Sequence, residues 1–313
     1  MWRTSGARIA QAVPLLLLVS AITFVLQLFI PGDAARSIGG LNASPEAVAA
    51  LRHRLHLDDP VWVQYWDWLK GAAHGDLGRS ITNNESVVSA LNMRLGATLS
   101  IVVAATLLSM IVGVALGMVS ARGGRRIGAV ADAASVVGMT IPAFWIGLLG
   151  IWIFNTKAAW LPANGYDSFG DSAEGWVRSI VLPACALTFM GVTVIAKQTR
   201  EQLVDIMSRD FVRNLRANGV SERSILFKHS LRHVSITVLT VAGNNLIGLL
   251  GSAVVIEELF GLPGLGGAAV TAASSGDIPV IQGVAVYFTL IVITLNLLLD
   301  LAVGRLNPQA VEA

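Results

Sequence analysis

The chain has 313 residues, of which 54% are hydrophobic and only 13% are charged, and its net charge is +2. A soluble domain has about 25% charged residues, so this composition leaves little room for an ordinary soluble globule. Disorder is excluded because so much apolar surface is available, and a disulfide scaffold is excluded because Cys185 is the sole cysteine. The near-neutral charge predicts no nucleic-acid partner. A membrane protein remains.

Six apolar stretches between charged residues have the length of about 20 residues that a membrane-spanning helix needs. In chain order they are 9–32, 95–121, 133–156, 179–196, 233–256 and 278–299. The first follows Arg3 and Arg8, as a signal peptide would, but it is too long for a signal core and no small-residue cleavage site closely follows. We therefore expect it to be retained, which predicts an all-α polytopic fold with six transmembrane helices.

Basic residues in the short loops predict the orientation of these helices. The loop after the second stretch contains Arg122, Arg125 and Arg126, and the loop after the fourth contains eight Lys and Arg residues. The loops after the third and fifth stretches contain two and none. Both termini are therefore expected on the cytoplasmic side of the plasma membrane.

The same pattern divides the chain into three parts. Residues 1–32 are the N-terminal tail and first helix, 33–94 are a long extracytoplasmic loop, and 95–313 are a five-helix core that includes a cytoplasmic loop at about 197–233. In the external loop, Ser44 before Pro45 is typical of a helix start. Four aromatic residues follow at partly helical spacing, at Trp62, Tyr65, Trp66 and Trp68. They predict either an interfacial belt or packed face, or a surface that receives an external partner.

The second cytoplasmic loop contains apolar residues spaced by four, at Leu203, Met207, Phe211 and Leu215. This spacing predicts one apolar stripe on a helix that ends at Gly219, and Ser221 can cap a second helix leading into the fifth span. Two interpretations stay open. The helix lies on the inner leaflet of the membrane, or it docks into a groove on a cytosolic protein.

Several kinds of chemistry are missing from the sequence. No Gly-Lys pair exists, so there is no Walker A loop for ATP, and no motif of a serine hydrolase or zinc protease is present. The six stretches lack the mid-membrane carboxylates of an ion-coupled carrier. His229 and His233 are spaced as metal ligands can be, but their basic surroundings favour an interfacial role, so we expect no metal site and no cofactor in this chain.

The polar and small residues inside the spans give two further expectations. Adjacent Asn244 and Asn245 must face protein or water, so they line a translocation path or form hydrogen bonds between helices. Gly113 and Gly117 have the spacing of a helix-packing face.

Three stretches are informative together: DFVRNLRANGVSER at 210–223, EELFGLPGLG at 257–266 and DIPVIQG at 277–283. A fourth stretch, GDLGRS at 75–80, supports them. They resemble the B-type permease subunits of bacterial dipeptide, oligopeptide and nickel ABC importers. The first is similar to that family's cytoplasmic EAA loop, with Gly219 at its hallmark glycine. The resemblance covers nearly the whole chain and implies the type I ABC importer permease fold.

The resemblance also implies partners. The cytoplasmic loop would supply a coupling helix that sits in a cleft of an ATPase subunit, and the residues carried over for docking are Arg213, Arg216, Ala217, Gly219 and Glu222. Two cytosolic ATPase subunits would bind ATP and Mg²⁺, and a second, homologous permease would complete the channel in the lipid bilayer. Alternating access would follow from ATP-driven movement of the paired coupling helices.

On the external side, the resemblance implies a substrate-binding protein over the first external loop, with Trp62, Trp66 and Arg79 as contacts. Glu257, Glu258 and Asp277 would lie near the external gate, although they could instead cap helix ends. Peptides are the expected cargo, with a nickel chelate, glutathione or haem as alternatives. A carrier or channel that works alone is the alternative function, and it would need a coupling-ion site or selectivity ring that the sequence does not contain.

Overall fold

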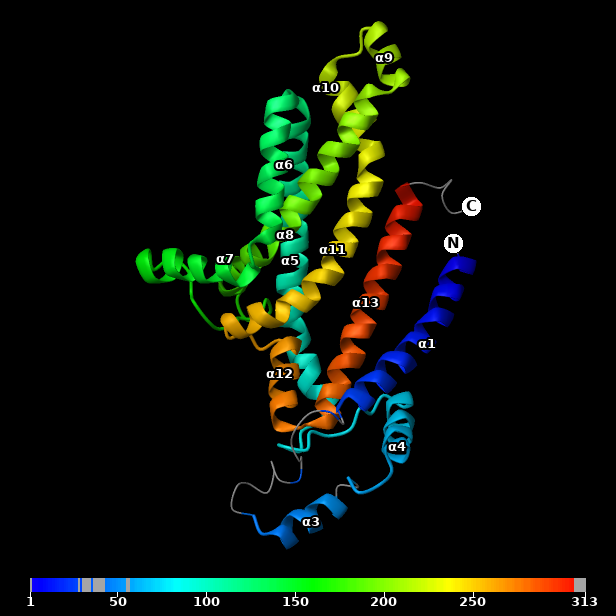
Figure 1. The fold of residues 1–313 in the computed structure, drawn as a ribbon, viewed down its shortest axis with the longest axis vertical. Coiled ribbons are helices and arrows are strands. Elements are labelled where there is room, and N and C mark those ends of the chain that lie inside the picture. The colour runs from blue at the N-terminus through cyan, green and yellow to red at the C-terminus, as the bar shows by residue number, and fades with distance from the viewer. Residues whose placement is uncertain (1, 28, 30–34, 36–42, 55–56, 307–313) are drawn as a thin grey trace. The chain divides into compact units, whose positions relative to one another are not determined.

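The computed structural model describes residues 2–27, 29, 35, 43–54 and 57–306, and nearly all of them are helical (Figure 1). Extended pairing within these residues is limited to an isolated antiparallel bridge between Arg79 and Ser86. The all-α expectation is therefore confirmed for the described part of the chain.

The chain forms two compact units. Unit one consists of the described residues of 99–262 and 295–306, and unit two consists of those of 2–98 and 263–294. The α-helices are α1 (Trp2–Gln27), α3 (Pro45–Arg54), α4 (Val61–Ala73), α5 (Val87–Arg122), α6 (Gly124–Thr140), α7 (Ala143–Gly150), α8 (Ala173–Ser208), α9 (Asp210–Ala217), α10 (Glu222–Ser224), α11 (Leu231–Leu259), α12 (Leu265–Ser275) and α13 (Ile278–Leu306). Two π-helical segments, Ile151–Lys157 and Ile225–Ser230, follow α7 and α10.

In the part of the chain that the structure describes, four helices are long and apolar enough to cross a membrane: Val87–Arg122, Ala173–Ser208, His233–Leu259 and Ile278–Arg305. They contain the predicted second, fourth, fifth and sixth spans, and each is longer than the predicted stretch. In α1 the apolar part is shorter, at Ala12–Leu26. Residues 28 and 30–32, which end the predicted first span, lie outside the described residues.

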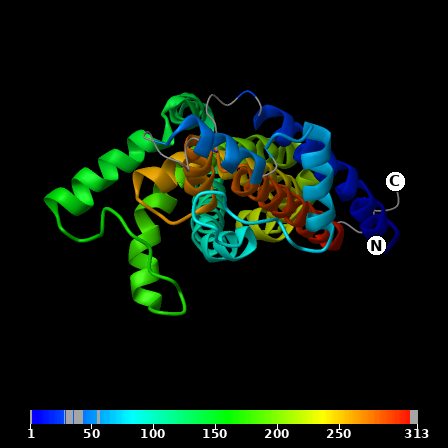
Figure 2. The same cartoon turned by 90° about the horizontal axis from the view of Figure 1, so that it is seen from below.

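The predicted third span, 133–156, is not one continuous helix. α6 ends at Thr140 and α7 begins at Ala143, and the two directions differ by 88° (Figures 1 and 2). The cause is Pro142, which has no N–H to donate and whose ring forces the preceding Ile141 out of the helical region, to φ −77° and ψ 120°. Among the described residues, four helices are therefore long and apolar enough to span a membrane, or five if the bent pair counts as one.

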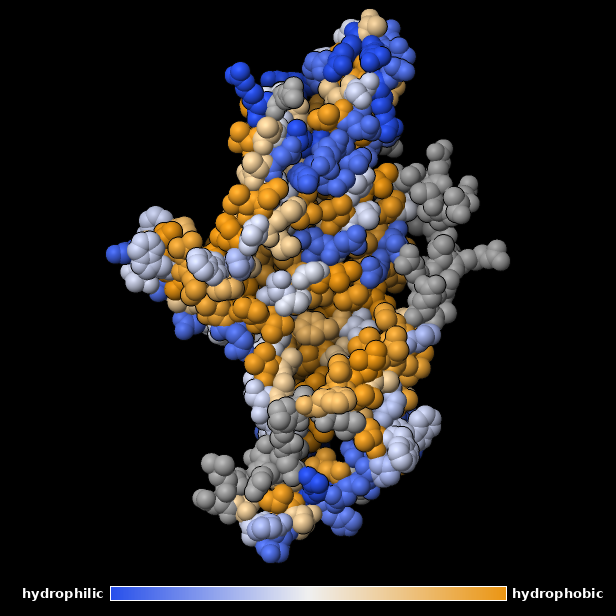
Figure 3. All heavy atoms as spheres, viewed as in Figure 1, coloured by the Kyte–Doolittle hydropathy of each residue, from blue (hydrophilic) through white to orange (hydrophobic). Residues whose placement is uncertain are grey.

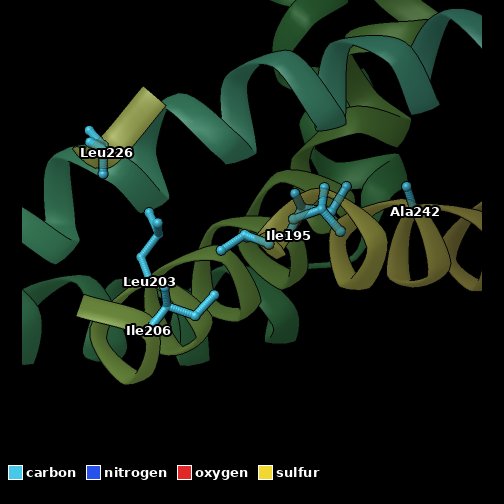
Figure 4. Packing of buried hydrophobic residues seen from close by; sticks show 7 residues of the cluster. Ile195, Leu203, Ile206, Leu226 and Ala242 are labelled. Atoms are coloured by element: carbon cyan, nitrogen blue, oxygen red, sulfur yellow. The ribbon is translucent and has the colours of Figure 1, made fainter. Parts of the chain in front are cut away.

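The core of unit one lies between α8 and α11. Figure 4 shows part of this cluster, with Ile195, Leu203 and Ile206 of α8 near Leu226 and Ala242. α5 packs closely on α8 because two of its glycines face that helix. A Cβ atom at Gly113 would lie 2.9 Å from the Cβ of Ile195, and one at Gly117 would lie 2.6 Å from the Cβ of Thr199. The predicted role of this glycine pair in helix packing is confirmed.

Unit two has its own core, formed where α5 and α12 pack with α13. The buried hydrophobic residues of this core are Leu77, Val87, Leu91, Leu265, Ala268 and Val284. α3 starts where the sequence predicts, because the Ser44 hydroxyl accepts a hydrogen bond from the backbone N–H of Ala47 at 3.2 Å. This bond satisfies one of the free amides at the helix N-terminus.

Candidate functional site

A tight turn joins α9 to α10 beyond the end of α8 (Figure 1). The N–H of Gly219 donates to the carbonyl of Arg216 at 3.0 Å, and the N–H of Val220 donates to the carbonyl of Leu215 at 3.1 Å. These two bonds are the pair that defines a Schellman motif. Gly219 has φ +75°, a conformation that side-chain-bearing residues rarely adopt. The prediction that Gly219 is the C′ residue is confirmed, since α9 ends at Ala217 and Asn218 is its C-cap.

The second helix of the loop also begins as predicted. The Ser221 hydroxyl accepts from the backbone N–H of Ser224 at 3.4 Å. α10 then continues through the π-helical segment into α11, so the loop is covalently continuous with the fifth predicted span. The turn is thereby joined to the start of a long helix without an intervening loop.

The predicted apolar stripe does not lie on one helix. α8 ends at Ser208, Arg209 is extended at φ −72° and ψ 153°, and α9 starts one residue later. The Ser208 hydroxyl donates to the carbonyl of Asp205 at 2.7 Å, which satisfies an acceptor at the end of α8. Asp210 then places a negative charge in the first turn of α9, where the helix dipole favours it.

An ion pair crosses the Gly219 turn. Arg216 Nε donates to Glu222 Oε1 at 2.7 Å, and Arg216 Nη2 donates to Oε2 at 3.3 Å. The hydrogen bond from Arg216 lowers the pKa of Glu222 below its ordinary value, and the hydrogen bond to Glu222 raises the pKa of Arg216. The bidentate geometry fixes the two ends of the turn relative to each other.

The faces of α9 differ in polarity. Val212 is fully buried, and the ring of Phe211 lies 5.8 Å from that of His233. On the opposite side, Arg213 and Ala217 are exposed, and the surface around α9 is largely hydrophilic in Figure 3. The arrangement presents a rigid, charged helix–turn surface and anchors it by its apolar side.

The first cytoplasmic loop of the prediction contributes to the same site. The guanidinium of Arg122, at the end of α5, lies 5.9 Å from the ring centroid of Phe227 in the segment after α10. The Arg122 charge also contributes to lowering the pKa of Glu222, although less than the hydrogen bond from Arg216. Sequence reasoning used Arg122 for orientation only and missed this contact, because cation–π pairs between distant segments leave no pattern of spacing.

The two predicted path residues have different surroundings. Asn244 is exposed, whereas Asn245 lies against α8 and α5. A Cβ atom at Gly191 would lie 2.6 Å from Asn245 Nδ2 and would also collide with the Ser109 hydroxyl. Asn245 Nδ2 is buried and has no hydrogen-bond partner among the described residues. Gly191 and Ser109 were not predicted, and only their small size marks them in the sequence.

Glu257 and Glu258 occupy the last turn of α11. Glu257 is buried, at 1% exposed, and Glu258 is exposed. Their carbonyls accept from the backbone N–H groups of Leu262 at 2.9 Å and Gly261 at 3.3 Å. Gly261 has φ +57°, so the chain reverses here as a helix end does.

Asp277 belongs to unit two, where it joins two of the four family-like stretches. Its carboxylate Oδ2 accepts from the Ser80 hydroxyl at 2.5 Å and the Thr82 hydroxyl at 3.0 Å, and Oδ1 accepts from the N–H of Ile81 at 3.2 Å. It is 2% exposed. Residues 75–80 and 277–283, nearly 200 positions apart, therefore meet in one hydrogen-bonded cluster. Ser80 and Thr82 were not singled out from the sequence.

The aromatic residues of α4 divide into two sets. Tyr65 and Trp68 pack inward, and the ring of Tyr65 lies 5.4 Å from that of Phe24 in α1. Trp62 and Trp66 are 74% and 56% exposed. A packed face and an exposed pair thus share one short helix. Arg79 is also exposed, and its Nη1 donates to the carbonyl of Asn84 at 3.0 Å.

Comparison with known proteins identifies the chain's relatives. Residues 113–311 match the family described as binding-protein-dependent transport system inner membrane component, and residues 1–102 match the N-terminal part of such membrane components. A putative peptide transport system permease protein of Brucella abortus is 38% identical over 304 residues, which cover 96% of each chain.

Two further relatives extend this comparison. A dipeptide transport system permease protein of Alkalihalophilus pseudofirmus is 32% identical over 323 residues, which cover 96% of this chain and 97% of the relative. A glutathione transport system permease protein of Escherichia coli O6:H1 is 34% identical over 302 residues, which cover 96% of each chain.

Proposed function

Because the chain belongs to the family of inner-membrane components of binding-protein-dependent transport systems, we propose that it conducts peptides as one permease of an ATP-driven importer. As a member of this family it is a non-catalytic, multi-pass protein of the plasma membrane. The peptide cargo rests on its relatives, whose names specify peptides, dipeptides and the tripeptide glutathione. The family gives no support to a carrier that works alone. Nickel chelates and haem remain alternative cargoes.

The proposed topology has six membrane helices with both termini in the cytoplasm. α1 is the first span, and the bent pair α6 and α7 is the third. The basic residues in the loops after α5 and α8 support this orientation, because such residues are retained on the cytoplasmic side. Residues 1–32, 33–94 and 95–313 then form the first span with its tail, the external loop and the permease core.

The Schellman turn carries the proposal for energy coupling. Arg213, Arg216, Ala217, Gly219 and Glu222 form a docking surface for a cytosolic ATPase subunit. The support is geometric: this turn is exposed, its ends are joined by an ion pair, and it continues into α11. A pair of such subunits would bind ATP and Mg²⁺, so this chain needs no cofactor of its own.

The remaining partners are a second homologous permease and an extracytoplasmic substrate-binding protein. We assign Trp62, Trp66 and Arg79 to the contact with the binding protein, which their exposure supports. Asn244 and Asn245 are assigned to the translocation path. Glu257 and Glu258 of unit one and Asp277 of unit two are each assigned to the external gate.

Replacement of Gly219 by Val tests the coupling role. A Cβ atom at Gly219 meets no other atom within 4 Å, so the substitution acts only through the backbone, at roughly 1–2 kcal/mol. We expect lower substrate-stimulated ATP hydrolysis by the complex in proteoliposomes, with unchanged membrane insertion.

Gly75→Val is the matched control, since Gly75 has φ +82° and equally open surroundings just after the end of α4 but lies in the predicted external loop. Equal hydrolysis by Gly219→Val and the unsubstituted complex would reject the coupling assignment. Uptake of a labelled dipeptide and of glutathione by the same proteoliposomes tests the cargo separately.

A further inference from the structure

α5, α6 and α8 of unit one enclose a pocket of about 290 Å³ that has no part in the roles proposed above. Its walls are mainly apolar and include Leu116, Val119, Ile127 and Val130, each more than half exposed. These side chains lie on helices of membrane-spanning length or on the bent pair. The pocket therefore opens toward the surroundings of the helices instead of lying in a sealed core.

The packing of α6 on α8 explains why a cavity forms here. α6 contacts α8 at two glycines: a Cβ atom at Gly138 would collide with the short Thr193 side chain, and one at Gly128 would lie 2.9 Å from Arg200 Cζ, at the end of that long side chain. Between these two contacts, α6 lines the gap with small side chains, which include Ala131 and Ala134. Small side chains between two close contacts leave space that the protein itself does not fill.

One end of the pocket is positively charged. Arg200 Nη1 donates to Asp132 Oδ1 at 2.6 Å, so these two charges compensate each other. Lys197 also lines the pocket, and within the described part of the chain it has no acidic partner. Val192 lies eight residues before Arg200 on α8, or about 12 Å along the helix. The pocket is thus apolar along its length and cationic at one end.

The pocket is small and mainly apolar, which suits a slender apolar occupant. A single acyl chain is narrow enough, and an anionic headgroup would supply the counter-charge that Lys197 lacks. We propose that this pocket binds one anionic phospholipid, with an acyl chain against Leu116 and Val130 and the headgroup phosphate at Lys197.

Photocrosslinking in the assembled transporter tests this assignment. The complex is placed in phosphatidylcholine vesicles that contain a phosphatidylglycerol probe with a photoreactive acyl chain, and a phosphatidylcholine analogue serves as comparison. We expect the phosphatidylglycerol probe to label peptides spanning 116–135 and 192–200 in preference to the comparison probe. In the Lys197→Gln variant, labelling by the phosphatidylglycerol probe should fall about fivefold. This factor corresponds to the ~1 kcal/mol that one basic residue contributes at a membrane surface.

Lys228→Gln is the matched control, because Lys228 carries the same charge and is exposed but does not line the pocket. Its labelling should equal that of the unsubstituted complex. Equal labelling by both lipids, or an unchanged Lys197→Gln variant, would overturn the proposal. So would an efficient disulfide between cysteines placed at Val119 and on the second permease, because a protein segment would then cover the pocket. If Lys197→Gln does not assemble, Ala134→Phe fills the cavity and must abolish the labelling.

Discussion

Replacement of Asp277 should release the segment 80–82 of the external loop. The carboxylate accepts hydrogen bonds from two hydroxyls and from the N–H of Ile81, and it is nearly inaccessible to water. An Asn side chain has one acceptor oxygen and an amide that only donates. If its oxygen stays near Ser80, its NH₂ faces the N–H of Ile81, and that bond is lost.

The size of the expected effect follows from the kind of hydrogen bond that the substitution weakens or removes. A hydrogen bond to a charged group contributes about 1.5–3 kcal/mol, and the bonds that Asn keeps are weaker because the charge is gone. We therefore expect Asp277→Asn to lower the local opening free energy by about 2–3 kcal/mol. Hydrogen exchange at the Ile81 amide should then accelerate roughly 30- to 150-fold in the purified complex.

A graded series separates the bonds. Thr82→Val removes one hydroxyl donor and should have a smaller effect than Asp277→Ala, which removes every bond to the carboxylate. Ser80→Ala also removes the acceptor of the Thr82 and Asn83 N–H groups and should lie between them. Asp76→Asn is the control, because Asp76 accepts from the N–H of Gly78 at 2.9 Å and does not contact residues 80–82. If exchange at Ile81 is the same in Asp277→Ala and the unsubstituted protein, the cluster does not order this segment and the reasoning fails.

Three further predictions concern unit one. Because the hydrogen bond from Arg216 lowers the pKa of Glu222, the pair is complete above the ordinary value of 4.5 and is lost as the pH falls through the lowered value. A spin label at Ala217 should gain mobility in that acidic range, and a Glu222→Gln variant should lack the step. Gly117→Val should lower thermal stability by about 1–3 kcal/mol through overpacking against Thr199, and a label-free melting curve that does not shift would contradict this. Ser221→Ala should weaken the start of α10 by about 1 kcal/mol, seen as faster amide exchange at Ser224 with no change in α9.

Local signals in the sequence predicted the geometry of the Gly219 turn well. Gly219 and Ser221 act within a few residues of themselves, through a left-handed backbone conformation and a side-chain cap, so their consequences can be inferred from the chain alone. Gly113 and Gly117 are similar, because a missing side chain on one helix face indicates close packing whatever the partner is.

Two predictions about helix continuity were wrong because hydrophobic pattern was used without regard to helix-ending residues. Hydropathy alone made 133–156 continuous, although Pro142 lies inside it and prevents a continuous helix. Spacing by four joined 203–215 into one stripe, although Ser208 and Asp210 favour the end of one helix and the start of the next. The residues that end these helices are visible in the sequence, but the hydrophobic pattern was given more weight than they were.

Long-range pairs were beyond prediction. The cluster of Asp277 with residues 80–82 and the contact of Arg122 with Phe227 depend on how distant segments pack. Neither shows a spacing that a single sequence could reveal, even though family-like motifs marked 75–80 and 277–283 separately. A motif indicates that a segment matters, whereas the structure indicates which other segment it contacts.

α11 connects three of the proposed features of unit one. The Gly219 turn leads through α10 and the π-helical segment to its first residue, Asn244 and Asn245 lie near its middle, and Glu257 and Glu258 lie in its last turn. A helix of 29 residues is about 43 Å long and is stiff along its axis, so a shift at the docking surface need not be relayed through loops to reach the other end. The tight contact of Asn245 with Gly191 makes α8 the surface against which α11 would move. Widening that contact with Gly191→Ala should therefore change the coupling of ATP hydrolysis to transport even though Gly191 touches neither the docking surface nor the gate residues.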